Sequence, residues 1–133
     1  SDMLASQPIE HSCQGVGENG HIAFNDPNVA DYNDSEIVKI LQLDDACRQQ
    51  QHGEGHFPMF DAVPQYALTL TIPALCQAKK IICLCPETRK AKIVKTALKG
   101  EISETCPVTY LRTQPQLALA FGFHLTILLS AMF

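Results

Sequence analysis

The residues best suited to chemistry lie together in segment 15–27, which reads Gly-Val-Gly-Glu-Asn-Gly-His-Ile-Ala-Phe-Asn-Asp-Pro. Its three glycines let the backbone turn tightly and approach a ligand closely. They surround the imidazole of His21, and Asn19 and Asp26 lie near it in the sequence. A histidine beside an amide and a carboxylate has the parts of an oriented general acid or base. On spacing alone a structural loop histidine is the simpler interpretation, because glycine-rich loops are common.

The glycines at 15, 17 and 20 also match the bare pattern of a dinucleotide-binding loop. Such a site needs a helix that begins at the loop, and the Asn-Asp-Pro turn at 25–27 interrupts one. We therefore expect no dinucleotide here, and no other cofactor is indicated.

A second group of polar residues could hold a metal ion only if it were helical. His52 and His56 are four residues apart with Glu54 between them. Gly53 and Gly55 disfavour a helix, so a flexible substrate loop is the alternative. The six cysteines include no Cys-x-x-Cys pair, and their spacing supports no metal site either. We expect no metal.

The composition is that of a globular chain of 133 residues, with 46% apolar and 18% charged residues. The net charge of −4 gives no reason to expect nucleic acid as a partner. No secretory signal opens the chain, so we expect a cytoplasmic protein with reduced, mostly buried thiols. Ser1 and Asp2 ahead of Met3 resemble a cloning scar, which assigns residues 1–3 to it.

The last 17 residues, 117–133, carry no charge. That length is at the short limit for a membrane helix, and Gly122, His124 and Ser130 interrupt the run. We expect a buried terminal strand followed by a packed segment, and no membrane span.

Apolar runs alternate with helical patterns and turn signals, which predicts an α/β fold with a mainly parallel sheet and flanking helices. Strands are expected at 9–16, 37–43, 66–71, 80–85 and 117–123. Helices are expected at 45–51 behind an Asp44 or Asp45 cap, after a Thr71 cap, at 89–99 between a Thr88 cap and Gly100, and at 107–113.

The helix expected at 89–99 has two distinct faces. Its buried face is expected to consist of Ala91, Val94, Ala97 and Leu98. Lys90 falls in its first turn, where free N–H groups and the helix dipole favour an anion. A surface lysine on a solvated basic face is the plainer alternative.

Ligands of open parallel sheets bind beyond the carboxyl ends of the strands. Segment 15–27 and the turn at 86–90 both follow predicted strands. We therefore expect His21 and Lys90 on one rim of the sheet.

Four stretches resemble, in order, the glucosamine-6-phosphate deaminase family. Residues 15–27 resemble its signature loop, 63–70 the strand after that loop, 89–100 its phosphate-end helix and 106–112 its late short helix. The resemblance covers residues 9–115, and the first motif is highly specific. It implies a Rossmann-like fold in which residues 4–133 form one α/β domain, the C-terminal portion of a deaminase/isomerase domain.

The family converts glucosamine 6-phosphate and water to fructose 6-phosphate and ammonia, by ring opening and aldose–ketose isomerisation. The resemblance implies that His21 opens the ring, flanked by Asn19 and Asp26 where the family often has Asp and Glu. It also implies substrate contacts from Gly20 and from Lys90, which matches the family's phosphate-binding lysine. The implied partner is a phosphorylated amino sugar.

Family members are longer than this chain. Their first half supplies a second phosphate loop and the aspartate that takes the C2 proton, and neither is found here. The chain alone is therefore expected to need that half, or to act in a homo-oligomer.

Two alternatives stay open. A 6-phosphogluconolactonase of the same superfamily has a loop resembling Gly-His-Thr-Ala-Ser, whereas this chain has Gly-His-Ile-Ala-Phe at 20–24. A non-catalytic sugar-phosphate-binding or assembly module is favoured by the absent first half.

Overall fold

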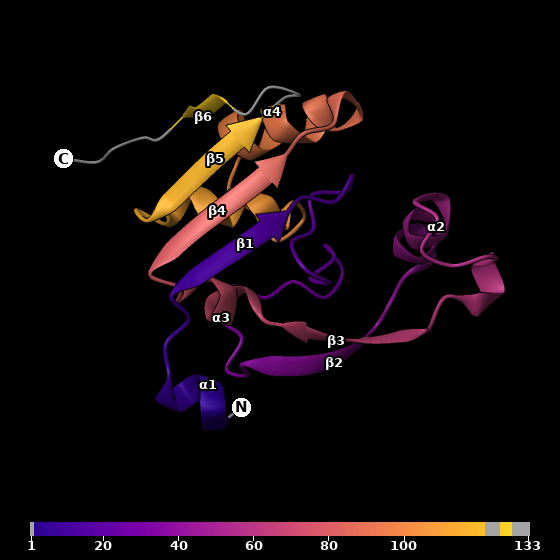
Figure 1. Ribbon diagram of the computed structural model, residues 1–133, viewed down its shortest axis with the longest axis horizontal. Helices are drawn as coiled ribbons and strands as arrows, with labels where there is room; N and C mark the ends of the chain where they lie inside the picture. Colours follow the sequence, from indigo (N-terminus) through magenta and orange to yellow (C-terminus); the bar gives the residue numbers. More distant parts are fainter. Residues whose placement is uncertain (1, 122–125, 129–133) are drawn as a thin grey trace.

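The computed structural model describes residues 2–121 and 126–128 (Figure 1). Its main sheet has the strand order β1-β4-β5-β6. The strands are β1 (His11–Gly15), β4 (Lys80–Cys85), β5 (Leu117–Phe121) and β6 (Thr126–Leu128). The first three run parallel and β6 is antiparallel to β5, which confirms a mainly parallel, Rossmann-like sheet.

Strand β1 lies at the edge of this sheet, and the edge position suits its polar sequence. Ser12 and Gln14 are buried, and the Gln14 amide donates to the Ser12 hydroxyl at 3.0 Å. The register pairs Gly15 with Leu84, so β1 and β4 end together. The loops that follow these two strands therefore begin at the same rim of the sheet.

The segments expected as strands at 37–43 and 66–71 do form strands, β2 (Val38–Gln42) and β3 (Tyr66–Leu70). The expectation that they feed the parallel sheet is wrong. They pair with each other in an antiparallel ribbon that extends from the main sheet toward α2 (Asp45–Gly53) (Figure 1). A short apolar run predicts a strand but does not specify its partner.

Two of the predicted caps are present. The Asp44 carboxylate accepts from the Cys47 N–H at 2.7 Å and begins α2. The Thr71 hydroxyl accepts from the Ala74 N–H at 3.4 Å and begins α3 (Ile72–Cys76). Other short helical elements are α1 (Asp2–Ser6), η1 (Phe60–Ala62) and η3 (Pro107–Thr113), the last at the predicted position.

The prediction that Thr88 caps a helix at 89–99 is wrong. The Lys90 N–H bonds the Glu87 carbonyl oxygen at 3.1 Å, which closes a 3₁₀ turn, η2 (Thr88–Lys90), first. Helix α4 (Ala91–Lys99) begins after it. Lys90 is therefore the N-cap residue of α4 and does not lie inside its first turn.

The predicted inner face of α4 is also partly wrong. Val94 and Ala97 pack against the core, joined by Ile93. Ala91 is exposed and Leu98 is 40% exposed. Helical spacing fits both the predicted face and the observed face of Ile93, Val94 and Ala97. The pattern of apolar residues alone therefore does not decide which of the two faces is buried.

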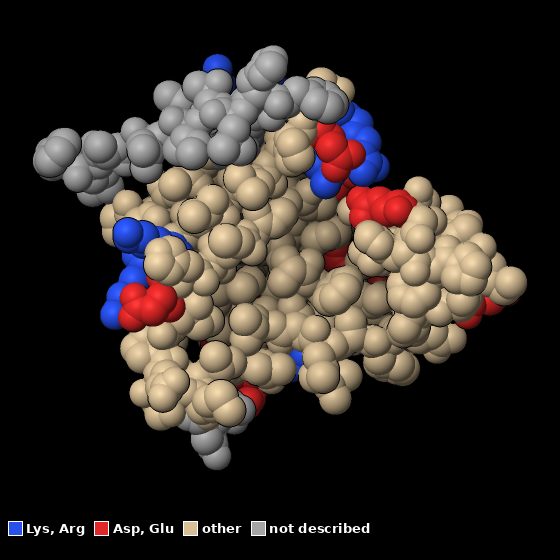
Figure 2. All heavy atoms as spheres, viewed as in Figure 1, with Lys and Arg blue, Asp and Glu red and all other residues tan. Residues whose placement is uncertain are grey.

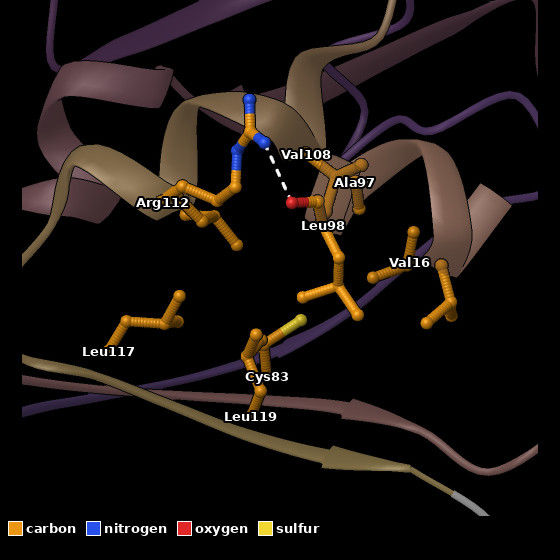
Figure 3. A pocket seen from close by; sticks show the side chains of 10 residues that line it. Val16, Cys83, Ala97, Leu98, Val108, Arg112, Leu117 and Leu119 are labelled. Carbon is orange, nitrogen blue, oxygen red and sulfur yellow. Dashed lines mark hydrogen bonds between the residues drawn. The ribbon is translucent and has the colours of Figure 1, made fainter. Parts of the chain in front are cut away.

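Helix α4 and η3 cover one face of the main sheet and enclose a small apolar cavity of about 20 Å³ (Figure 3). Arg112 of η3 bonds the C-terminal end of α4. Its guanidinium donates to the carbonyl oxygens of Leu98 at 2.8 Å and Gly100 at 2.6 Å, which satisfies acceptors that the end of a helix leaves free.

All six cysteines are free and five of them are buried, as the sequence indicated. Among the described residues, no helix has the length and apolar character that crossing a membrane requires. The expectation for residues 117–133 lies partly outside the described residues, which include β5 and β6 of that segment.

Candidate active site

The structure brings His21 and Lys90 to one cleft at the carboxyl ends of β1 and β4. The cleft has a volume of about 220 Å³. Its lining comes from the end of β1 and the loop that follows, from α2 and its C-cap residue, and from η2. The lining residues are Gly15, Val16, Gly17, His21, Ala23, Gln50, Glu54 and Lys90.

His21, Asn19 and Asp26 form one hydrogen-bonded group. Nδ1 of His21 lies 2.8 Å from Oδ1 of Asn19 and 3.0 Å from Oδ1 of Asp26. The Asn19 amide donates to the same Asp26 oxygen at 2.8 Å, and the His21 backbone N–H donates to Asn19 Oδ1 at 3.0 Å. With two acceptors at Nδ1, that nitrogen carries the proton, which leaves Nε2 as the basic nitrogen.

Asp26 remains ionised in this group. Its side chain is almost fully buried, and burial by itself raises a carboxyl pKa. Hydrogen bonds from His21 and Asn19 outweigh burial and hold the Asp26 pKa below its usual 3.8. Cys47 is a neighbour of Asp26. Burial first and then the Asp26 charge raise the pKa of the Cys47 thiol to about 12, so this thiol stays neutral.

The free energy of unfolding should depend on pH through the titration of the Asp26 carboxylate. Because the folded-state pKa of Asp26 is lowered, its contribution is present above the unfolded value and is lost as pH falls through the folded one. Asp26→Asn should lower the free energy of unfolding at neutral pH by about 1–3 kcal/mol. The difference from wild type should shrink as pH falls below about 4.

Denaturant titrations across this pH range measure the difference, with the exposed Asp61→Asn as the matched control. A deficit of Asp26→Asn that stays constant into strong acid would show that its charge does not stabilise the site.

Gly17 holds the imidazole in place by having no side chain. A Cβ at Gly17 would lie 2.1 Å from Cε1 and 2.3 Å from Nδ1 of His21, far inside contact distance. The ring therefore packs directly on the Gly17 backbone.

Gly17→Ala should displace the imidazole from Asn19 and Asp26. The buried Asp26 then loses the hydrogen bond from His21, so the melting temperature should fall, and turnover should fall by on the order of 10-fold or more. Thermal unfolding and steady-state kinetics measure the two effects. Gly53→Ala is the matched control, because a Cβ there meets nothing. Equal loss of activity in both variants would contradict the packing role.

Gly20, predicted as a substrate contact, is not among the residues that line the cleft. Its φ is +89°, and a Cβ would lie 2.8 Å from Cys106 Sγ. Its carbonyl oxygen accepts from the Val108 N–H at 2.8 Å. Gly20 therefore shapes the loop that carries His21 and fixes it to η3.

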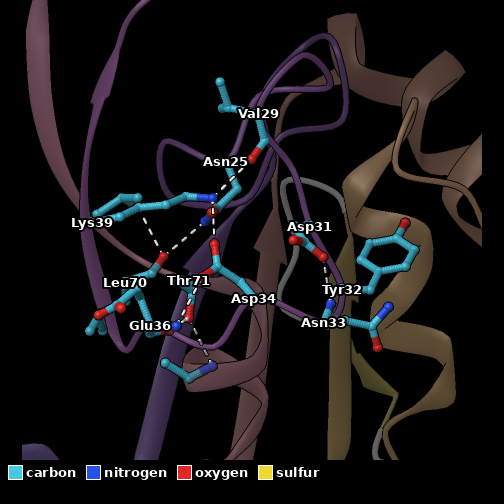
Figure 4. A network of polar contacts seen from close by, with 12 residues as sticks. Asn25, Val29, Asp31, Tyr32, Asn33, Asp34, Glu36, Lys39, Leu70 and Thr71 are labelled. Atoms are coloured by element: carbon cyan, nitrogen blue, oxygen red, sulfur yellow. Dashed lines mark hydrogen bonds and ion pairs between the residues drawn. The ribbon is translucent and has the colours of Figure 1, made fainter.

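The β2–β3 ribbon fixes the other end of the loop (Figure 4). The buried Asn25 amide donates to the carbonyl oxygens of Ile22 at 3.0 Å and Leu70 at 2.9 Å. The Lys39 ammonium bonds the Val29 carbonyl oxygen at 2.9 Å and the Asp34 carboxylate at 2.7 Å. Through these contacts the β2–β3 ribbon holds the segment that follows His21.

Lys90 presents its charge from the start of α4. Its side chain is only 11% exposed, and its Nζ lies 3.2 Å from a Glu87 carboxylate oxygen. A buried ammonium at a helix N-terminus favours an anion. In this position an incoming anion would compete with Glu87.

A set of charged residues that no sequence motif predicted joins α2 to η2. Arg89 ion-pairs with Glu87, with Glu18 of the loop and with Glu54 at the end of α2. Figure 2 shows acidic and basic side chains gathered between α2 and α4. Gln50 joins the set, donating to Glu54 at 2.9 Å. Their wide separation in sequence explains why spacing could not reveal them.

The two histidines with metal-like spacing do not share a helix face. His52 lies in α2, where its Nδ1 is 3.1 Å from the Phe57 carbonyl oxygen, and His56 lies beyond the helix end. Within residues 2–121 and 126–128, no three His, Cys, Asp or Glu residues group closely enough to hold a metal ion.

No family model matches the chain. Among curated proteins it is similar to glucosamine-6-phosphate deaminases of Bacillus cytotoxicus, at 33% identity over 117 residues, and of Bacillus cereus strain B4264, at 32% over 117 residues. Each match covers 88% of this chain and 43% of the relative. The chain thus spans less than half the length of these relatives.

The fold is similar to those of solved sugar-phosphate enzymes. A monomeric glucosamine-6-phosphate deaminase superposes with a TM-score of 0.82 at 28% identity, covering 92% of this chain and 49% of that one. The 6-phosphogluconolactonase of Leishmania guyanensis gives 0.61 at 21% identity, over 86% of this chain and 40% of that one. The second likeness concerns the fold alone.

Proposed function

We propose, from the premise that this chain is related in sequence and fold to part of the glucosamine-6-phosphate deaminase family, that its cleft binds a phosphorylated amino sugar and opens the sugar ring. Isomerisation to the ketose and loss of ammonia would follow. The observation that carries the proposal is the pairing of His21, held through Nδ1, with Lys90 in the same cleft.

His21 is the proposed proton shuttle of ring opening. Ring opening moves a proton from the C1 hydroxyl to the ring oxygen, so one group must accept it and return it. The contacts at Nδ1 leave Nε2 free for this task, and Asp26 stabilises the imidazolium while it exists. Asn19 orients the ring through its oxygen but adds no charge.

Lys90 is the proposed ligand of the phosphate. Its ammonium lies at the helix N-terminus and, within the described part of the chain, pairs with one carboxylate, that of Glu87, at 3.2 Å. A phosphate offers more acceptor oxygens and more charge than this carboxylate, so it can displace Glu87 from Lys90.

The other catalytic groups are proposed to come from outside this chain. The base for the C2 proton and a second phosphate loop belong, by resemblance, to the part of the relatives that this chain does not span. We propose that the cleft is completed by that part or by another copy of the chain. A phosphorylated sugar as substrate also supports a cytoplasmic location.

A lactonase activity is the nearest rival. The two Bacillus relatives described above, at 33% and 32% identity, are deaminases, which favours deamination. The test is to assay the full-length protein for ammonia release from glucosamine 6-phosphate and for hydrolysis of 6-phosphogluconolactone. We expect ammonia release. Lactone hydrolysis without ammonia release would replace the proposal, and binding of fructose 6-phosphate without either turnover would indicate a non-catalytic module.

A further inference from the structure

The cleft that contains His21 and Lys90 also contains one carboxylate. Of the described residues that line it, Glu54 is the acidic one. A carboxylate beside a phosphate site is costly for an anionic ligand, because like charges repel strongly where water is partly excluded. Its presence therefore needs a compensating positive group, on the protein or on the ligand.

The protein holds Glu54 firmly but uses mainly one of its oxygens. Oε1 accepts from the Gln50 amide at 2.9 Å and from the Arg89 guanidinium at 3.2 Å. Among the described residues, the contact of Oε2 is a longer approach, 3.4 Å, from the exposed imidazole of His56. The Glu54 side chain is 23% exposed, so Oε2 keeps acceptor capacity at the cleft.

Glu54 is also ionised when the cleft is empty. Partial burial raises its pKa, but hydrogen bonds from Gln50 and Arg89 and the nearby charge of Lys90 leave the Glu54 pKa below its ordinary value. An ionised carboxylate with one oxygen held by Gln50 and Arg89 and the other only weakly engaged is suited to bind a cation at the second oxygen.

We propose that Glu54 determines specificity by binding the ammonium group at C2 of the sugar phosphate. This inference rests on the proposed function and names the group that separates an amino sugar from a neutral one. Glucosamine 6-phosphate carries its negative charge on the phosphate, for Lys90, and a positive charge at C2, for Glu54. A sugar phosphate with a hydroxyl at C2 would lose the ion pair and keep the repulsion, so the same residue attracts one substrate and rejects the other.

The competing explanation is structural, since Glu54 also ties α2 to η2 through Arg89. That role would affect every ligand of the cleft alike. A comparison of two ligands that differ only at C2 therefore separates the explanations.

The test measures the dissociation constants of 2-amino-2-deoxyglucitol 6-phosphate and glucitol 6-phosphate by calorimetry, with the full-length protein. Wild type should prefer the amino compound by about 10- to 100-fold, the range of a charge-assisted hydrogen bond. Glu54→Gln should lose most of this preference and bind glucitol 6-phosphate as well as wild type or better. Glu18→Gln, which removes another carboxylate partner of Arg89 without altering the lining of the cleft, should keep the preference.

An unchanged preference in Glu54→Gln, or an equal weakening of both ligands, would overturn the role of Glu54 and leave the proposed function intact. Failure of wild type to bind either compound would overturn the proposed function and, with it, this inference.

Discussion

Replacing His21 by Gln is expected to slow turnover of closed-ring glucosamine 6-phosphate by on the order of 10²-fold or more, the usual size of an acid–base contribution. Glutamine can keep a contact with Asn19 or Asp26 but cannot exchange a proton. Substrate binding should change much less. Steady-state kinetics on the full-length protein gives both quantities.

A substrate that is already open separates ring opening from other tasks of His21. An open-chain analogue should be slowed far less than the pyranose by His21→Gln. The matched control is His11→Gln, an exposed histidine at the start of β1, which should leave both rates unchanged. Equal slowing of the two substrates would assign His21 a structural role in the loop.

Replacing Lys90 by Ala is expected to raise the Michaelis constant for the phosphorylated sugar by about 10- to 100-fold, with a smaller change in kcat. A partly buried charge-assisted contact to phosphate contributes about 1.5–3 kcal/mol, whereas an exposed lysine contributes little. Kinetics over a wide substrate range measures the separation of the two constants.

Lys92→Ala is the control for this variant. Lys92 lies in the same basic helix but is exposed and does not line the cleft. It should behave as wild type. If the two variants gave the same small effect, the phosphate would bind elsewhere and the basic helix would be a solvated surface.

Local sequence signals predicted local structure well. The run from Lys80 to Cys85 forms β4 over its full length, and Asp44 and Thr71 cap helices because a side-chain oxygen can reach an N–H nearby in sequence. Thr88 carries the same signal, but the 3₁₀ turn at Glu87 begins the element first. Caps are predictable as candidates, and neighbouring backbone geometry decides among them.

Long-range pairing was not predictable in the same way. Apolar periodicity specifies that β2 and β3 are strands, but not that they pair with each other outside the parallel sheet. This pairing also affects the site. The ribbon holds the loop through Asn25, and α2, which follows β2, contributes to the lining of the cleft.

For the candidate site, the loop motif predicted the group of His21, Asn19 and Asp26 because all three lie within a few residues. The position of Glu54 in the cleft could not be predicted, since its contact with Arg89 joins residues 35 positions apart. Its neighbours in sequence, two glycines and two histidines, suggested a flexible loop or a metal pair instead.

The position of a bound sugar phosphate decides whether His21 and Lys90 act together in one cleft. A crystal structure of the full-length protein with 2-amino-2-deoxyglucitol 6-phosphate tests it in one measurement. The phosphate should contact Lys90 Nζ in place of Glu87, and the C1 oxygen should lie within hydrogen-bond distance of His21 Nε2. An analogue bound outside this cleft, or bound with its phosphate at His21 while Lys90 stays paired with Glu87, would contradict it.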